Sequence, residues 1–233
     1  MYNARMNARP KRDGGTRERR NRDAGRSREA ILAAAEAIFA ERGYDGAGLA
    51  DIAASAGLAR ATPTYFFGSK RALYEAVLAR ATSAREQALH EAFQPVRSWA
   101  EESGGRAELR GALLQAIGRY LAFLDANPSF ARLIGWEAQT GAHGLTGGGV
   151  PTAAVTEALG ALHAVRHERG LAEFEPALVS VALVSMCFLP VAHGATFRAG
   201  GGIDTSAPAF RHAYAEVVAD AIMGLLATGR SSS

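Results

Sequence analysis

The stretch LARATPTYFFGSKRAL, residues 58–73, lies between two segments with helical hydrophobic spacing and decides the fold of the N-terminal part. It combines hydroxyls, aromatic rings, a proline and a lysine within one short segment. Gly57 directly precedes it, at a place where a glycine can end a helix in the left-handed conformation. Because Pro63 is tolerated only in the first turn of a helix, we expect a short polar helix that begins near Arg60.

The flanking segments complete a three-helix unit. Ser27 is a favourable N-cap for a first helix that Gly43 would end. The apolar stripe of that helix is Ile31, Leu32, Ala35, Ile38 and Phe39. A second, shorter helix carries Leu49, Ile52, Ala53 and Ala56. Ser69 can cap a longer helix that runs toward Phe93.

This order of helices has the layout of a helix-turn-helix, since a small Ala53 four residues before Gly57 lets two helices approach closely. In that layout the third helix lies in the major groove of DNA. Arg60 can make a bidentate contact to guanine, whereas Thr62, Thr64 and Tyr65 can bind phosphates or touch a thymine methyl group. Lys70 stands where a helix N-terminus and a positive charge can hold a phosphate together.

Residues 28–77 resemble the DNA-binding domain of the TetR (tetracycline repressor) family. The residues that carry the resemblance are Ile31, Leu32, Ala34, Ala35, Ile38, Phe39, Gly43, Tyr44, and the segments 51–53 (DIA), 56–58 (AGL) and 67–73 (FGSKRAL). The resemblance implies a phosphate contact at Lys70, and we include Arg28 among the expected DNA contacts. The chain departs from the family pattern at Ala47, Gly48, Ala50, Ala59, Ala61 and Thr64. These departures weaken helix capping and several phosphate contacts.

A basic arm precedes the first helix. Residues 1–28 hold ten arginines and lysines against three carboxylates, so their net charge is +7, whereas the rest of the chain carries −4. We expect residues 1–26 to form a disordered arm that follows the phosphate backbone and replaces some of the missing contacts. The alternative is a tail that only improves solubility. Among the aromatic residues, we expect Phe66 or Phe67 in the core and Tyr65 toward the groove.

The remaining sequence is also helical in pattern, so the predicted fold class is all-α. We expect helices near residues 109–127, 130–137, 151–168, 176–193 and 208–227, a connection at 95–105 and a loop at 140–149. The predicted domains are a helix-turn-helix domain over 27–80 and a larger helical domain over 81–228. The single Cys187 and the absence of zinc-like spacing predict no metal, no cofactor and a reducing cytoplasm, and no run of residues predicts a membrane span.

The resemblance implies that residues after 81 bind a small molecule and pair two chains into a homodimer. The expected partners are therefore a pseudo-palindromic double-stranded DNA operator, a partly apolar effector and a second copy of the chain. Repression would be relieved when the effector binds. An effector site needs apolar walls with a few polar groups. The candidate pocket residues are Phe123, Trp136, Met186 and His193.

Two other classes of function compete with this interpretation. An enzyme is disfavoured because the sequence has no Gly-rich phosphate loop, nucleophile elbow or HExxH motif, although Glu137 and His143 could form an acid and base pair. The second is a homodimeric helical sensor that acts through protein contacts without specific DNA binding. The departures from the family pattern favour that sensor, whereas Lys70 and the basic arm favour a DNA-binding regulator.

Overall fold

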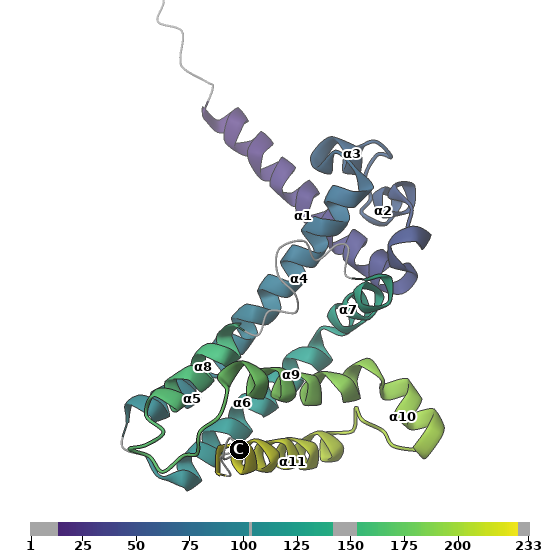
Figure 1. Cartoon of the computed structure of the whole chain (residues 1–233). Coiled ribbons are helices and arrows are strands. Elements are labelled where there is room, and N and C mark those ends of the chain that lie inside the picture. The colour runs from purple at the N-terminus through teal and green to yellow at the C-terminus, as the bar shows by residue number, and fades with distance from the viewer. Residues whose placement is uncertain (1–13, 103, 142–152, 228–233) are drawn as a thin grey trace, which may run out of the picture. The chain divides into compact units, whose positions relative to one another are not determined.

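The computed structural model describes residues 14–102, 104–141 and 153–227, and over these ranges the fold is all-α (Figure 1). The helices are α1 (Gly14–Gly46), α2 (Leu49–Ser55), α3 (Thr62–Phe67), α4 (Lys70–Ala92), α5 (Gln94–Glu101), α6 (Arg106–Ala126), α7 (Pro128–Thr140), α8 (Ala153–Ala164), α9 (Pro176–Ala192), α10 (Gly194–Gly201) and α11 (Pro208–Ala227). The chain divides into two compact units, Met1–Tyr74 and Glu75–Ser233. This division and the predicted 80/81 boundary both fall within α4.

The first unit is built on the apolar stripe of α1. Ile31, Ala35 and Phe39 are fully buried, as the helical spacing predicts. The Phe39 ring packs edge-on against Tyr74 at 4.9 Å between centroids, and Tyr44 lies 5.1 Å from the same ring. These rings pack the start of α4 against the end of α1.

The second unit has its core among α5, α6, α8, α9 and α11. Along α6 the buried residues are Leu109, Leu113, Ala116, Ile117, Tyr120, Leu121 and Leu124. Arg110 of α6 also forms ion pairs with Glu216 and Asp220 of α11. The α6 and α11 pair is therefore held both by apolar packing and by charges at its edge.

A proline inside α9 creates a link to α11. Pro190 has no N–H, so the Met186 carbonyl loses its ordinary partner four residues later. The Tyr214 hydroxyl on α11 donates to this carbonyl at 3.1 Å. The carbonyl of Pro190 in turn accepts a bond from Thr205 Oγ1 at 2.8 Å, which holds the connection between α10 and α11.

The structure differs from the predicted elements at several places. Helix α1 begins at Gly14 rather than Ser27, so residues 14–26 of the predicted disordered arm are helical and that part of the prediction is wrong. Ser27 lies inside the helix, where its hydroxyl donates back to the Asp23 carbonyl instead of capping. The predicted connection at 95–105 is mostly helix α5. Pro95 lies in the first helical turn there, and Val96, Trp99 and Ala100 are buried. Helix α10 was not predicted, since its sequence GATFRAGG has three glycines and no buried residue.

Boundaries also move in the middle of the chain. Helix α7 begins at Pro128 and runs to Thr140, longer than the predicted 130–137, and α8 ends at Ala164 rather than near residue 168. Most of the predicted loop at 140–149 and residues 1–13 of the predicted arm lie outside the described residues. In the described ranges no single helix has the length and hydropathy to cross a membrane; α9 and α10 meet that test only together, with a 65° bend between them.

Candidate nucleic-acid interface

The turn between α2 and α3 is closed by backbone hydrogen bonds. Gly57 has a φ of 68°, the left-handed conformation that its sequence position predicts. The N–H of Leu58 donates to the Ala53 carbonyl at 2.9 Å, and the N–H of Gly57 donates to Ala54 at 3.0 Å. This Schellman pair satisfies the last carbonyls of α2 and turns the chain directly into the approach to α3.

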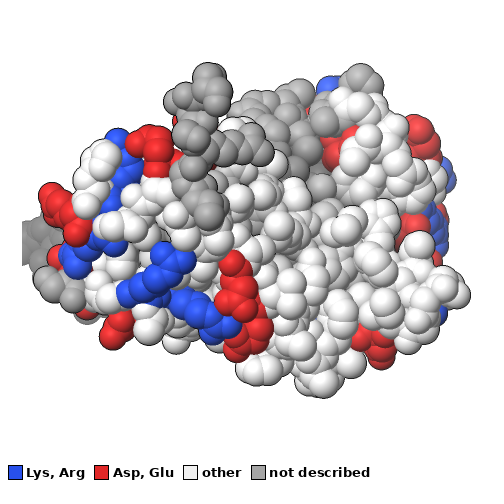
Figure 2. Space-filling model, turned by 60° about the horizontal axis from the view of Figure 1, so that its bottom comes forward, with Lys and Arg blue, Asp and Glu red and all other residues white. Residues whose placement is uncertain are grey.

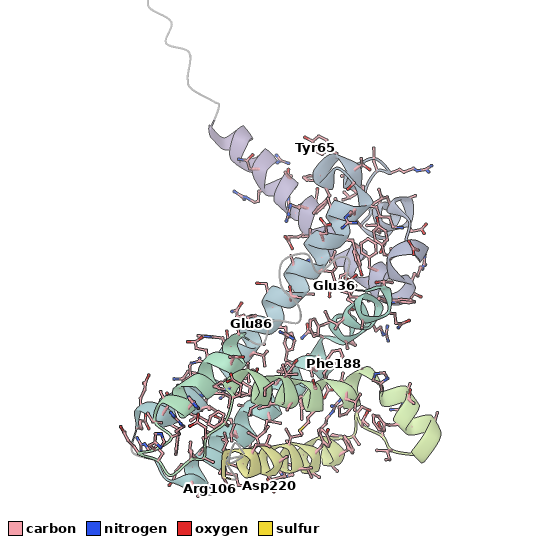
Figure 3. All side chains as sticks on the ribbon, in the orientation of Figure 1. Glu36, Tyr65, Glu86, Arg106, Phe188 and Asp220 are labelled. Carbon is pink, nitrogen blue, oxygen red and sulfur yellow. The ribbon has the colours of Figure 1, made fainter. Side chains whose placement is uncertain are left out.

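Helix α3 is short and presents polar side chains to solvent. Pro63 lies in its first turn, as predicted, and is buried, whereas Thr64 is exposed and Thr62 is half-buried. Tyr65 is 83% exposed, the largest exposure among the large hydrophobic residues described. Figure 3 shows its ring projecting outward from α3. Arg60 is exposed just before the helix, so it and Tyr65 are both available to a ligand surface.

Two features fix the start of α4. Ser69 Oγ accepts a bond from the Ala72 N–H at 3.1 Å, which confirms the predicted cap. The Lys70 ammonium lies over the Tyr44 ring and donates to the Asp45 carbonyl. Lys70 is half-buried, yet an ammonium has three donors and can bind a phosphate while keeping these contacts.

Arginines join α1 to the other helices of the unit. The Arg28 guanidinium lies 5.0 Å from the centre of the Phe67 ring, and Arg42 pairs with Asp51 of α2 at 3.2 Å. Both arginines remain exposed. These contacts therefore join α1 to the end of α3 through Arg28 and to α2 through Arg42. Neither Phe66 nor Phe67 is fully buried; both are half-buried, and Phe67 is covered by Arg28.

Sequence reasoning did not find the link between Arg42 and Asp51, nor the stacking of Arg28 on Phe67. Arg42 and Asp51 are nine residues apart and lie on different helices, so helical spacing does not predict their contact. Helix α2 begins at Leu49, and its N-cap residue Gly48 has no side chain to cap it, as the lack of Ser or Thr leads one to expect. The six residues predicted to contact DNA stay a prediction.

The four predicted effector residues lie in the second unit on different elements. Phe123 is half-buried on α6 and lies 6.2 Å from the Phe130 ring. Trp136 on α7 and Met186 on α9 are also half-buried, whereas His193 is exposed between α9 and α10. Two hollows of about 420 and 390 Å³ lie between α4 and α8 and between α6 and α11, and none of the four residues lines them. The predicted pocket is therefore not one of these hollows.

Other candidates for chemistry lie in the same unit. Cys187 is completely buried, so it packs as a small apolar core residue, and burial raises the pKa of its thiol to about 12. Glu137 is buried on α7, and His143 lies outside the described residues, so their proposed pairing has no geometry to support it. Within the described ranges, no cluster of His, Cys, Asp and Glu could hold a metal ion.

Comparison with known proteins agrees with the geometry of the first unit. Residues 31–77 match the family model described as bacterial regulatory proteins, tetR family. This match spans the stripe of α1, all of α2 and α3, and the start of α4. The search of curated proteins found no match.

Solved structures match over most of the chain. One, described as a TetR-family transcriptional regulator from Mesorhizobium loti, is 22% identical and has a TM-score of 0.63, with 87% of this chain and 97% of that chain covered. A transcriptional regulator from Streptomyces coelicolor is 25% identical with a TM-score of 0.61, covering 84% and 97%. A regulator from Marinobacter aquaeolei is 19% identical with a TM-score of 0.59, covering 87% and 97%. The fold is thus shared along nearly the whole length of these proteins.

Proposed function

Because the chain belongs to the TetR family of DNA-binding transcriptional regulators, we propose that it represses transcription from a pseudo-palindromic operator and is released by a small molecule. The observation that carries the proposal is the exposed side of the helix-turn-helix. Arg60 and Tyr65 are exposed to solvent, and Lys70 is the first residue of α4, the helix that follows α3 in the chain. Such a surface can read base edges with one side chain and hold phosphates with the others.

The proposed contacts divide by role. Arg60 reads a guanine, whereas Thr62, Thr64 and Tyr65 bind phosphates or a thymine methyl group. Lys70 and Arg28 supply positive charge to the backbone of the duplex. A regulator must be in the same compartment as the DNA that it binds, so the proposed location is the cytoplasm.

A homodimer is supported by exposed apolar side chains on two adjacent helices of the second unit. Helices α9 and α11 pack on each other, and Leu178 and Val217 are 70% and 62% exposed. Val181, Leu189 and Leu225 are also exposed on these helices. Figure 2 views the molecule with its bottom brought forward, and charged side chains are sparse over a broad part of that face. A second copy of this surface would cover the apolar residues and place two α3 helices on one duplex.

Release by an effector requires two conformations. In one form the two α3 helices of the dimer fit the operator, and in the other their spacing does not fit it. An effector shifts this equilibrium only if it binds the second form more tightly than the first. Helix α4 provides the covalent path, because it begins beside the helix-turn-helix and continues into the second unit.

The test is fluorescence anisotropy of purified protein with labelled DNA from upstream of its own gene and with a random duplex of equal length. The proposal expects saturable binding that is stronger for the upstream DNA, weakens steeply with salt, and gives a footprint with twofold symmetry. Equal binding to both duplexes across the salt series would contradict an autoregulated repressor. Dimers without such binding would favour the alternative, a helical sensor that acts through protein contacts.

A further inference from the structure

A buried arginine lies in the core of the second unit without the hydrogen bonds that a buried charge requires. Arg85 on α4 is 0% exposed. None of its Nε, Nη1 and Nη2 atoms makes a hydrogen bond of normal geometry to a described residue. Because burying an unsatisfied charge is costly, an arginine in this state indicates a missing acceptor.

The neighbouring carboxylate does not provide that acceptor. Glu86 Oε2 lies 3.6 Å from an Arg85 nitrogen, beyond hydrogen-bond distance. The other carboxylate oxygen accepts the backbone N–H of Ala154 at 2.6 Å, at the start of α8. A helix N-terminus attracts negative charge, so Glu86 is held toward α8 and compensates the Arg85 charge only in part.

A second buried donor faces the same place. The Tyr120 hydroxyl on α6 is buried and has no hydrogen bond of normal geometry among the described residues. Burial raises the pKa of Tyr120, so the group is a neutral O–H donor, and its hydroxyl lies close enough to the Arg85 guanidinium for the two groups to interact. Burial likewise lowers the pKa of Arg85, although arginine stays protonated in proteins. The Tyr120 hydroxyl and the Arg85 guanidinium also interact with each other, although not with the geometry of a full hydrogen bond. Their remaining donors come from two helices and have no acceptor among the described residues.

A chain of aromatic rings begins next to these donors. The Phe130 ring on α7 lies 5.7 Å from the Arg85 guanidinium carbon. Phe130 also contacts Phe123 of α6 at 6.2 Å and Phe188 of α9 at 6.3 Å between centroids. Figure 3 labels Glu86 on α4 and Phe188 on α9, two of the four helices that contribute to this cluster. The environment combines a cationic head with apolar walls, the composition of a site for an amphiphilic anion.

We propose that Arg85 and Tyr120 bind the carboxylate of an apolar carboxylic acid, and that this acid is the effector of the regulator. The identification as an effector rests on the proposed function, whereas the binding of the acid does not. A planar guanidinium matches a carboxylate with two parallel hydrogen bonds, and the tyrosine hydroxyl adds a third. The rings would cover the apolar part of the acid. A dianionic phosphate fits less well, because one arginine cannot balance its charge between apolar walls.

The direct test uses matched acids and alcohols. Thermal unfolding of the full-length protein is measured with decanoate and 1-decanol, and with 3-phenylpropanoate and 3-phenyl-1-propanol, all below micellar concentrations. We expect at least one acid to raise the Tm above that of its alcohol, because ligands that bind only the folded state stabilise it. The rise should vanish in Arg85→Met and persist in Arg119→Met, which removes an exposed arginine of α6. Acids that act no better than their alcohols, or that act equally on Arg85→Met, would overturn the proposal.

Stability without any acid gives an independent result. Methionine has a similar length and no charge, so Arg85→Met removes the unsatisfied charge while filling the space. We expect its Tm to equal or exceed that of the wild type. A large fall, or a failure to fold, would show that Arg85 is a structural partner of Glu86 and would overturn the proposal.

Measurements of DNA binding distinguish a failure of the acid site from a failure of the proposed regulatory function. Without added acid, the wild type and Arg85→Met should bind the upstream DNA equally, and the acid that raises the Tm should release DNA from the wild type alone. Acid binding without any DNA binding would contradict the regulator but keep the acid site. DNA binding that no acid alters, together with unchanged Tm values, would contradict the acid site and keep the regulator.

Discussion

The Lys70 ammonium lies 4.6 Å from the centre of the Tyr44 ring and donates to the Asp45 carbonyl at 3.3 Å. These two contacts hold the first residue of α4 against the end of α1. The charge is therefore positioned before DNA arrives, and less side-chain entropy is lost when a phosphate binds. The N-terminal N–H groups of α4 add donors at the same place.

Replacing Lys70 by Ala should weaken binding to all duplexes to a similar extent. A phosphate contact carries no sequence information, so selectivity should stay while the slope of log affinity against log salt falls by about one. Anisotropy titrations at several salt concentrations measure both quantities. The control is Arg119→Ala, an equal charge change on α6. Lys70→Ala with an unchanged slope, or Arg119→Ala with the same loss, would argue against the phosphate role.

A pair of identical substitutions should have opposite effects on stability. Gly57 has a φ of 68°, and an added Cβ would meet no atom within 4 Å, so Gly57→Ala should cost about 1–2 kcal/mol from backbone strain alone. Gly111, inside α6, also has open space around an added Cβ, and Gly111→Ala should stabilise by about 0.5–1 kcal/mol. Urea unfolding measures both. If both variants shift the midpoint the same way, the turn does not require the left-handed conformation.

Replacing an exposed apolar residue of α9 or of α11 by Asp should disrupt the proposed dimer. Leu178→Asp and Val217→Asp place a charge on exposed positions of α9 and α11, where burial against a second copy would desolvate it. We expect monomers in sedimentation velocity, with helical circular dichroism unchanged and DNA affinity reduced at least about tenfold, since one half-site is lost. Gln115→Asp, at an exposed position of α6, is the control and should stay dimeric. Dimers in both apolar variants would place the interface elsewhere.

Asp204 should make stability depend on pH in the acid range. Bonds from Ser206 and from Arg198 lower the pKa of the Asp204 carboxyl from 3.8 to about 2. A depressed pKa favours the folded state once the carboxyl is ionised, so this contribution is present above pH 4 and is lost as pH falls toward 2. Asp204→Asn should therefore lower the Tm slightly at neutral pH, and the difference should shrink below pH 4. A constant difference in thermal melts across this range would contradict the bonding at Asp204.

The sequence predicted the first unit well because its signals are local. Helical spacing, Gly57, Pro63 and Ser69 each act within one or two turns, and each occupies the predicted role in the structure. Predictions failed where a local signal has two meanings. Pro95 is compatible both with a loop and with the first turn of a helix, and it lies in the first turn of α5. Only the burial of Trp99 distinguishes the helix from the loop.

The sequence did not predict the candidate acid site, because its only signal is one charged residue within the apolar stripe of a helix. Arg85 occupies a place in the buried stripe of α4 that includes Leu78, Ala81 and Leu89. A charged residue at such a position is a sequence signal for buried function. Its partners Tyr120 and Phe130 come from α6 and α7, and no spacing in the sequence relates these helices to α4.

The most direct test of the account is the selectivity of Arg60→Ala for operator DNA. Competition anisotropy gives the ratio of affinities for the upstream DNA and a random duplex, for the wild type, Arg60→Ala and Arg71→Ala. We predict that Arg60→Ala loses about 1–3 kcal/mol of selectivity, while Arg71→Ala, which removes the same charge, keeps it. If Arg60→Ala retains the wild-type ratio, base reading by this turn and α3 is contradicted.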